Sequence, residues 1–159
     1  MGNRHETDVE QLLLRNYDKY YRLAYSYVKS EQDALDIVQE SAYKAIRDSQ
    51  KVKSREYMET WLYRIVINTS IDFLRKRKKE VLMEVEWEGQ EMNPQEGTEL
   101  KEVLEKLEEK ERTVIILRYV HELKLDEISQ IVGENVNTVK ARLYRTLKKL
   151  KVEMESEYR

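Results

Sequence analysis

The sequence contains no cysteine, a single proline, four glycines and a single phenylalanine. Without cysteine the chain can form neither disulfides nor thiolate metal sites, which is typical of proteins from a reducing compartment. So few helix-breaking residues in 159 positions predict long helices with few interruptions. The two histidines, His5 and His121, lack the spacing of a metal-binding motif, so we expect neither a metal nor another cofactor.

Long hydrophobic runs are also missing. No apolar stretch approaches the roughly 20 residues that cross a bilayer, and the early acidic residues Glu6, Asp8 and Glu10 are unlike a signal peptide. We therefore expect a cytoplasmic protein without membrane insertion. The sequence shows no Gly-rich phosphate loop, nucleophile–base pattern or metal cluster, so we expect neither an enzyme nor a small-molecule substrate.

Charge, in contrast, is abundant and unevenly distributed. Charged residues make up 38% of the chain, yet the net charge is only −2. Twelve acidic residues and three lysines lie between positions 80 and 111, whereas positions 136–151 carry six cations and no acid. Five consecutive cations occupy positions 75–79. Segregation of this kind indicates an anionic partner better than the net charge does.

Apolar residues recur every three or four positions in three segments of the N-terminal half, which predicts three amphipathic helices. We expect them over about 7–28, 30–48 and 57–78, with a polar loop at 49–56. Ser30 is the predicted N-cap of the second helix, and Asp33 occupies the acidic position of a capping box. Three helices of this length can bury a core between them.

Residues 80–97 break this pattern. They combine glycines, an Asn-Pro pair and many glutamates, which predicts an acidic, flexible linker. Helical periodicity resumes at about residue 98 and again over about 110–121. We therefore expect an all-α fold of two small helical modules, 1–79 and 98–159, joined by the linker 80–97.

The last third of the chain has the pattern of a helix-turn-helix. A short helix over 125–132 is followed by Gly133, and Asn135 is a suitable N-cap for the next helix. That helix is basic apart from one apolar stripe, which consists of Val136, Val139, Leu143, Leu147 and Leu150. Such a helix fits the major groove of DNA, which is about 12 Å wide. The alternatives are a basic helix packed in a bundle or lying on a membrane, although a membrane helix would not need the preceding helix and turn.

Two blocks of the N-terminal half carry a resemblance to a known family. Positions 33–43 read DALDIVQESAY, and positions 60–79 read TWLYRIVINTSIDFLRKRKK. An Asp-x-x-Gln-Glu helix followed by Trp-Leu, Asn-x-x-x-Asp and a basic cluster resembles region 2 of the bacterial sigma factors. The helix-turn-helix resembles their region 4. The chain as a whole is similar to the shorter sigma factors of the sigma-70 family, those of the extracytoplasmic function (ECF) type.

This resemblance implies that the protein binds RNA polymerase core and directs transcription from promoters, without being a catalyst. The implied contacts with the β′ clamp helices of the core are Leu35, Asp36, Gln39 and Glu40. The implied contacts with the −10 promoter element are Trp61, Arg64, Asn68, Asp72, Arg75, Lys76 and Arg77, beside a loop at about 51–57 that would hold a flipped base. The implied contacts with the −35 element are Thr138, Lys140, Ala141, Arg142, Tyr144, Arg145 and Lys148. The β flap of the polymerase and an anti-sigma factor are further implied partners.

Two departures favour an alternative sigma factor over a primary one. Primary sigma factors carry a pair of tryptophans where this sequence has Trp61-Leu62, and they have an additional domain for which the predicted linker is too short. Two other classes of function remain open. One is a helix-turn-helix regulator that binds an operator without polymerase, and the other is a helical adaptor with no role on DNA.

Overall fold

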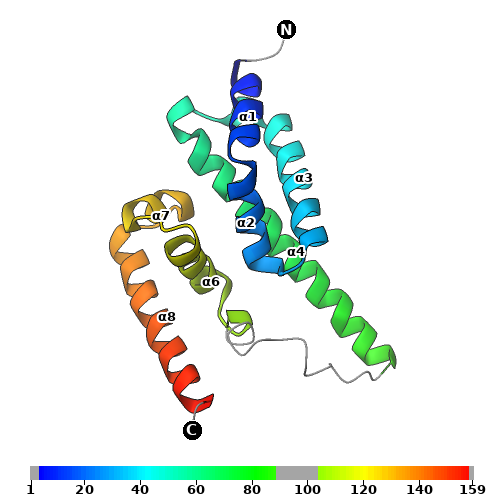
Figure 1. Ribbon diagram of the computed structural model, residues 1–159, viewed down its shortest axis with the longest axis vertical. Coiled ribbons are helices and arrows are strands. Elements are labelled where there is room, and N and C mark those ends of the chain that lie inside the picture. The colour runs from blue at the N-terminus through cyan, green and yellow to red at the C-terminus, as the bar shows by residue number, and fades with distance from the viewer. Residues whose placement is uncertain (1–3, 89–103, 158–159) are drawn as a thin grey trace. The chain divides into compact units, whose positions relative to one another are not determined.

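The structure is a computed structural model that describes residues 4–88 and 104–157. Within these residues it contains helices and turns but no strand, as the sequence predicts (Figure 1). The chain divides into two compact units, Met1–Arg77 and Lys78–Arg159. Among the described helices, none has the length and apolar character needed to cross a bilayer.

The described residues of the first unit lie mainly in four helices, the last of which continues beyond Arg77. They are α1 (Arg4–Arg15), α2 (Tyr17–Val28), α3 (Glu31–Arg47) and α4 (Met58–Glu88), with two 3-10 turns, Ser49–Lys51 and Arg55–Tyr57, between α3 and α4. α2 and α3 pack side by side (Figure 1). α4 lies against both, with Tyr63 contacting α2 and Thr69 contacting α3. The Tyr63 ring meets Tyr20 of α2 edge-on at 5.9 Å, and Lys44 of α3 donates to the Thr69 hydroxyl of α4 at 3.2 Å.

Apolar side chains from all four helices fill the core of this unit. The fully buried large side chains are Val9, Tyr20, Leu23, Tyr27, Ile37, Met58, Leu62 and Val66. Ser30 caps α3 as predicted, since its hydroxyl accepts a hydrogen bond from the Asp33 backbone N–H at 3.3 Å. The Asp33 carboxylate forms an ion pair with Arg77, which joins the start of α3 to α4.

The element boundaries differ from the prediction in three places. The expected first helix is divided at Asn16, whose φ and ψ of −110° and 23° leave the helical region. The expected loop contains the two 3-10 turns and is anchored by Val52, which is 4% exposed. α4 continues past the predicted end at Lys78 to Glu88, because the intervening residues include neither glycine nor proline.

The second unit carries the helix-turn-helix. Its described helices are α6 (Glu109–Ile115), α7 (Leu125–Val132) and α8 (Val136–Glu157), and the π-helical segment η3 (Ile116–Val120) extends α6. α8 packs against both α6 and α7 (Figure 1). Gly133 ends α7 with a φ of 71°, where a residue with a Cβ would be strained. The helix expected from residue 98 falls largely outside the described residues.

The apolar stripe predicted for α8 forms most of its buried face. Val139 and Leu143 are buried together with Val114, Leu117, Ile128 and Ile131 of the preceding segments. Leu147 and Leu150 are half-buried, but Val136 is 39% exposed. The N-cap is confirmed, because Asn135 Oδ1 accepts a hydrogen bond from the Asn137 N–H at 2.7 Å.

Candidate functional site

The outward face of α3 carries the acidic residues expected to bind polymerase. Ala34, Ile37 and Val38 hold the opposite face in the core, and helical geometry therefore turns Asp36, Gln39 and Glu40 to the exterior. The Asp36 carboxylate accepts a hydrogen bond from Gln32 Nε2 at 3.1 Å, and Glu40 lies 3.5 Å from Lys44.

Two further residues complete this face. Leu35 is half-buried at its edge, and Tyr43, one turn after Gln39 and Glu40, is 66% exposed. The resulting strip of carboxylates, an amide and a neighbouring aromatic ring can pair with basic and apolar groups of a partner protein.

The exposed face of α4 brings together the residues expected to meet the −10 element. Arg64, Asn68 and Asp72 are exposed and follow one another at four-residue steps, so they form a single row along the helix. Arg75 continues this row and lies 3.9 Å from Asp72. Trp61 is half-buried at the start of the row. An amide, a carboxylate and guanidinium groups in one row supply both donors and acceptors to base edges and phosphates.

The basic segment of α4, residues 75–79, is only partly available to a ligand. Lys76 is exposed, whereas the Arg77 guanidinium is engaged by the Asp33 carboxylate of α3, with side-chain exposures of 54% and 21%. The loop expected to hold a flipped base comprises the turn Arg55–Tyr57 and the residues before it, with Tyr57 56% exposed. Its role stays a prediction.

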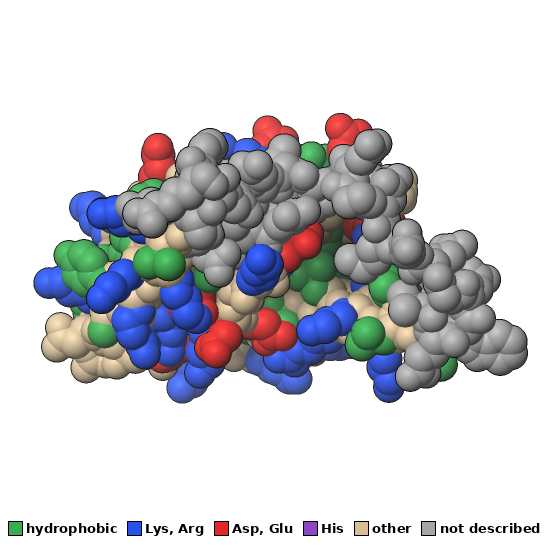
Figure 2. Space-filling view, turned by 90° about the horizontal axis from the view of Figure 1, so that it is seen from below, with side chains coloured by type: hydrophobic (Ala, Val, Ile, Leu, Met, Phe, Trp, Pro, Cys, Tyr) green, Lys and Arg blue, Asp and Glu red, His purple; other side chains and the backbone are tan. Residues whose placement is uncertain are grey.

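The exposed face of α8 carries six of the seven residues expected to meet the −35 element. They are Thr138, Lys140, Ala141, Tyr144, Arg145 and Lys148. Tyr144 is 62% exposed, and Val139 and Leu143 fix the opposite face in the core. Lysine and arginine side chains, shown in blue, are prominent on the side of the molecule seen in Figure 2. A supported basic helix with exposed polar side chains is the arrangement that reads the major groove.

The seventh residue, Arg142, does not share this exposure. Its side chain is only 13% exposed, and its guanidinium donates to both carboxylate oxygens of Glu134, at 2.9 and 3.0 Å. The adjacent guanidinium holds the pKa of the Glu134 carboxyl below its usual value, against an opposing effect of partial burial. In the sequence, Arg142 and Arg145 are equivalent residues of one basic helix. Only the structure shows that Arg142 is paired with Glu134 whereas Arg145 is exposed.

A buried polar cluster between α6 and α8 was not predicted. Glu111 is 7% exposed and Thr146 is fully buried. The Thr146 hydroxyl lies 2.7 Å from the Arg142 carbonyl and 3.2 Å from the Glu111 carboxylate, and Lys149 Nζ lies 3.0 Å from the other carboxylate oxygen. Burial alone would raise the pKa of Glu111, but Lys149, the Glu108 backbone N–H and Thr146 outweigh it and hold the pKa below its usual value.

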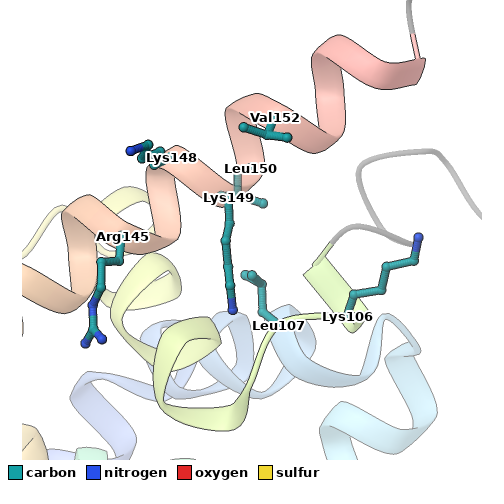
Figure 3. A pocket seen from close by; sticks show the side chains of 7 residues that line it. All are labelled: Lys106, Leu107, Arg145, Lys148, Lys149, Leu150 and Val152. Atoms are coloured by element: carbon teal, nitrogen blue, oxygen red, sulfur yellow. The ribbon is translucent and has the colours of Figure 1, made fainter.

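An open groove of about 510 Å³ lies beside the C-terminal half of α8 (Figure 3). Leu107, Leu150 and Val152 provide its apolar surface. Its cationic lining consists of Lys106, Arg145, Lys148 and Lys149. The groove therefore suits an elongated partner segment with both apolar and acidic side chains.

Comparison with known proteins identifies the family of both units. Residues 12–80 match the family described as Sigma-70 region 2, and residues 98–150 match Sigma-70, region 4. The RNA polymerase sigma factor SigV of Bacillus subtilis is 47% identical over 143 residues, which cover 87% of this chain and 86% of SigV. The chain belongs to the sigma-70 family of RNA polymerase sigma factors.

Other comparisons define the type of sigma factor and its fold. The ECF RNA polymerase sigma factor SigW of Bacillus subtilis is 34% identical over 147 residues, covering 80% of this chain and 79% of SigW. The sigma factor RpoE of Bartonella quintana, solved in complex with the anti-sigma factor NepR, has a TM-score of 0.69 and 24% identity, covering 93% of this chain and 97% of RpoE. CnrH, solved with the cytosolic domain of CnrY, has a TM-score of 0.70 and 23% identity, covering 93% of this chain and 88% of CnrH.

These findings confirm the all-α fold of two sigma modules and the ECF type. An ECF sigma factor is an alternative specificity subunit: it binds RNA polymerase core and directs initiation at promoters with −10 and −35 elements. The family membership favours this function over that of an operator-binding regulator that acts without polymerase.

Proposed function

We propose that three helix faces divide the work of this sigma factor. The outward face of α3 binds polymerase core, the exposed row on α4 contacts the −10 element, and the exposed face of α8 contacts the −35 element. The observation that carries this assignment is the presence in one chain of an acidic outward face on α3 and a basic outward face on α8. A regulator that binds its operator without polymerase would need only the basic face on α8.

The same assignment implies roles for the two modules, the groove beside α8 and an anti-sigma factor. Modules over 1–79 and 98–159, joined by residues 80–97, of which 80–88 continue α4, would let one polymerase hold both DNA contacts at once. The apolar surface of the groove beside α8, formed by Leu107, Leu150 and Val152, would receive a segment of the β flap, while Arg145 and Lys148 would contact the −35 element. An anti-sigma factor would act by covering one or more of these faces. The protein would act in the bacterial cytoplasm as a binding subunit rather than as an enzyme.

Transcription in vitro tests the assignment of function as a whole. Bacterial core polymerase is mixed with this protein and fragmented genomic DNA, and the 5′ ends of the transcripts are mapped. We expect discrete start sites that share two upstream sequence elements and are absent with core alone. A folded protein and an active core that together give no specific start sites would contradict the proposal.

The polymerase-binding face is tested by charge reversal on α3. We expect the double substitution Asp36→Lys with Glu40→Lys to abolish binding to core while the helical circular dichroism is unchanged, because both side chains are exposed. The measurement is the affinity of labelled protein for core polymerase. Glu10→Lys with Asp18→Lys is the matched control, since it reverses two exposed charges on α1 and α2. Unchanged affinity of the α3 variant would show that core binds elsewhere.

A further inference from the structure

The turn of the helix-turn-helix is linked to the second helix, α8, by an ion pair of the Glu134 carboxylate. Glu134 follows Gly133, which ends α7, and precedes Asn135, the N-cap of α8. Its backbone N–H donates to the Ser129 carbonyl at 3.2 Å, and its own carbonyl accepts a hydrogen bond from the Ser129 hydroxyl. The backbone of Glu134 is thereby fixed to α7, while its side chain points to α8.

The other half of this connection is Arg142, two turns into α8. Both terminal nitrogens of its guanidinium donate to Glu134, at 2.9 and 3.0 Å, so the contact is bidentate. Lys110 of α6 approaches the same carboxylate at 4.0 Å, with a side chain that is 72% exposed. The exposures of the Arg142 and Glu134 side chains, 13% and 24%, place the pair largely out of solvent, where it is screened less than a surface ion pair.

We propose that Glu134 and Arg142 are positioning residues for −35 recognition: their ion pair fixes α8 relative to α7, and Arg142 itself does not contact DNA. This inference rests on the proposed role of α8. Two fixed points, the N-cap at Asn135 and the pair at Arg142, hold the first turns of α8, from which Lys140, Ala141 and Tyr144 project. Small changes in the orientation of this segment would move all of these side chains relative to the base edges.

The variant Glu134→Gln, which removes the acid of the pair, distinguishes a positioning role of Arg142 from direct contact with DNA. The two roles predict opposite results for this variant. The measurement is the affinity of the complete holoenzyme for a promoter fragment, divided by its affinity for the same fragment with a scrambled −35 element. If Arg142 contacted DNA, loss of a nearby carboxylate would preserve or increase this ratio. We expect the ratio to fall about tenfold, the scale of a charged hydrogen-bonded pair.

Asp126→Asn is the matched control for this variant. It also removes one acidic charge from the helix-turn-helix, but Asp126 is exposed on α7, and we expect its ratio to equal that of the natural protein. We expect Arg142→Gln to lower the affinity ratio as much as Glu134→Gln does. In the double Gln variant the ratio should fall no further than in either single variant. An unchanged or increased ratio in Glu134→Gln would overturn the proposal.

A charge exchange gives a second test that also applies if the Gln variants fold poorly. The variant Glu134→Arg with Arg142→Glu keeps an ion pair at the same place but puts an acid in α8. We expect it to recover the −35 ratio to within about threefold of the natural protein, and circular dichroism verifies that it is folded. If Arg142 were a DNA contact, the exchanged variant would be at least as defective as Arg142→Gln, which would overturn the proposal.

The pair can also be tested without polymerase or DNA. In the free protein, titration of the Glu134 carboxyl by NMR should give a pKa below the usual range of glutamate, and Arg142→Gln should return it toward that range. A normal pKa in the natural protein would show that the pair does not form, and the proposal would fail. If the holoenzyme containing the natural protein bound both DNAs equally, with the natural and with the scrambled −35 element, this would instead refute the proposed role of α8, independently of the pair.

Discussion

At the scale of single residues, the two central arginines of α8 show what a sequence pattern cannot decide. Arg142 and Arg145 lie three positions apart in the same basic helix, and both were expected to contact DNA. In the structure Arg142 is bound by Glu134, whereas Arg145 is exposed. Residue type and helical phase predict which face a side chain occupies, but not whether a residue from the preceding turn neutralises it.

Arg145 is therefore the arginine of α8 whose loss should change promoter selection directly. We expect Arg145→Ala to reduce discrimination between a natural and a scrambled −35 element by roughly 1–3 kcal/mol, the scale of one base contact. Promoter binding by the holoenzyme measures this difference. Lys151→Ala, which removes an exposed charge further along α8, should change both affinities equally. Equal losses on both DNAs for Arg145→Ala would identify Arg145 as a phosphate contact.

At the scale of elements, the helices of the first unit and the helix-turn-helix were predictable because their apolar residues follow the helical period. Ser30, Gly133 and Asn135 marked helix ends correctly, since each has a specific backbone role. The contact between α6 and α8 was not predictable. Glu111 and Thr146 are polar, so their sequence pattern gave no sign that they are buried, and their partners come from distant positions.

This contact should make the stability of the second unit depend on pH. The folded-state pKa of Glu111 is lowered, so its ionised form adds stability above the usual glutamate value of 4.5, and this stability is lost as the pH falls through the folded-state pKa. We expect Glu111→Gln to be less stable than the natural protein at neutral pH and to lose less stability on acidification. Urea unfolding of both proteins, measured from neutral pH down to below the folded-state pKa of Glu111, gives the free energy of unfolding at neutral pH and its loss on acidification.

Glu105→Gln serves as the control for the same chemical change at an exposed position. It should have the neutral-pH stability and acid dependence of the natural protein. Parallel acid profiles for the natural protein and Glu111→Gln would mean that the Glu111 contact contributes nothing to the pH dependence.

At the scale of the whole molecule, the division into two units follows from two separate cores. The buried side chains of the first unit come from α1 to α4, and those of the second come from α6 to α8. The break in helical periodicity after residue 79 predicted two modules, but the sequence did not predict that α4 runs on to Glu88, because the acidic composition after residue 79 indicated a linker rather than a helix.

Separate cores should unfold separately. Leu23 and Leu117 are both fully buried, one in each unit. We expect Leu23→Ala to destabilise the first unit and Leu117→Ala the second, each by roughly 2–5 kcal/mol. Hydrogen exchange resolved along the chain measures the two units independently, and each variant is the control for the other. Loss of protection in both units from either substitution would show that the molecule unfolds as a single cooperative unit.

The position of Trp61 has a practical consequence for following promoter binding. The sequence has two tryptophans, Trp61 and Trp87, and Trp61 is half-buried at the start of the row formed by Arg64, Asn68 and Asp72. Indole emission shifts with the polarity of its surroundings and is quenched when a nucleobase stacks on the ring. A Trp87→Phe protein would therefore report the arrival of DNA at α4 through its intrinsic fluorescence, in real time and without an added label.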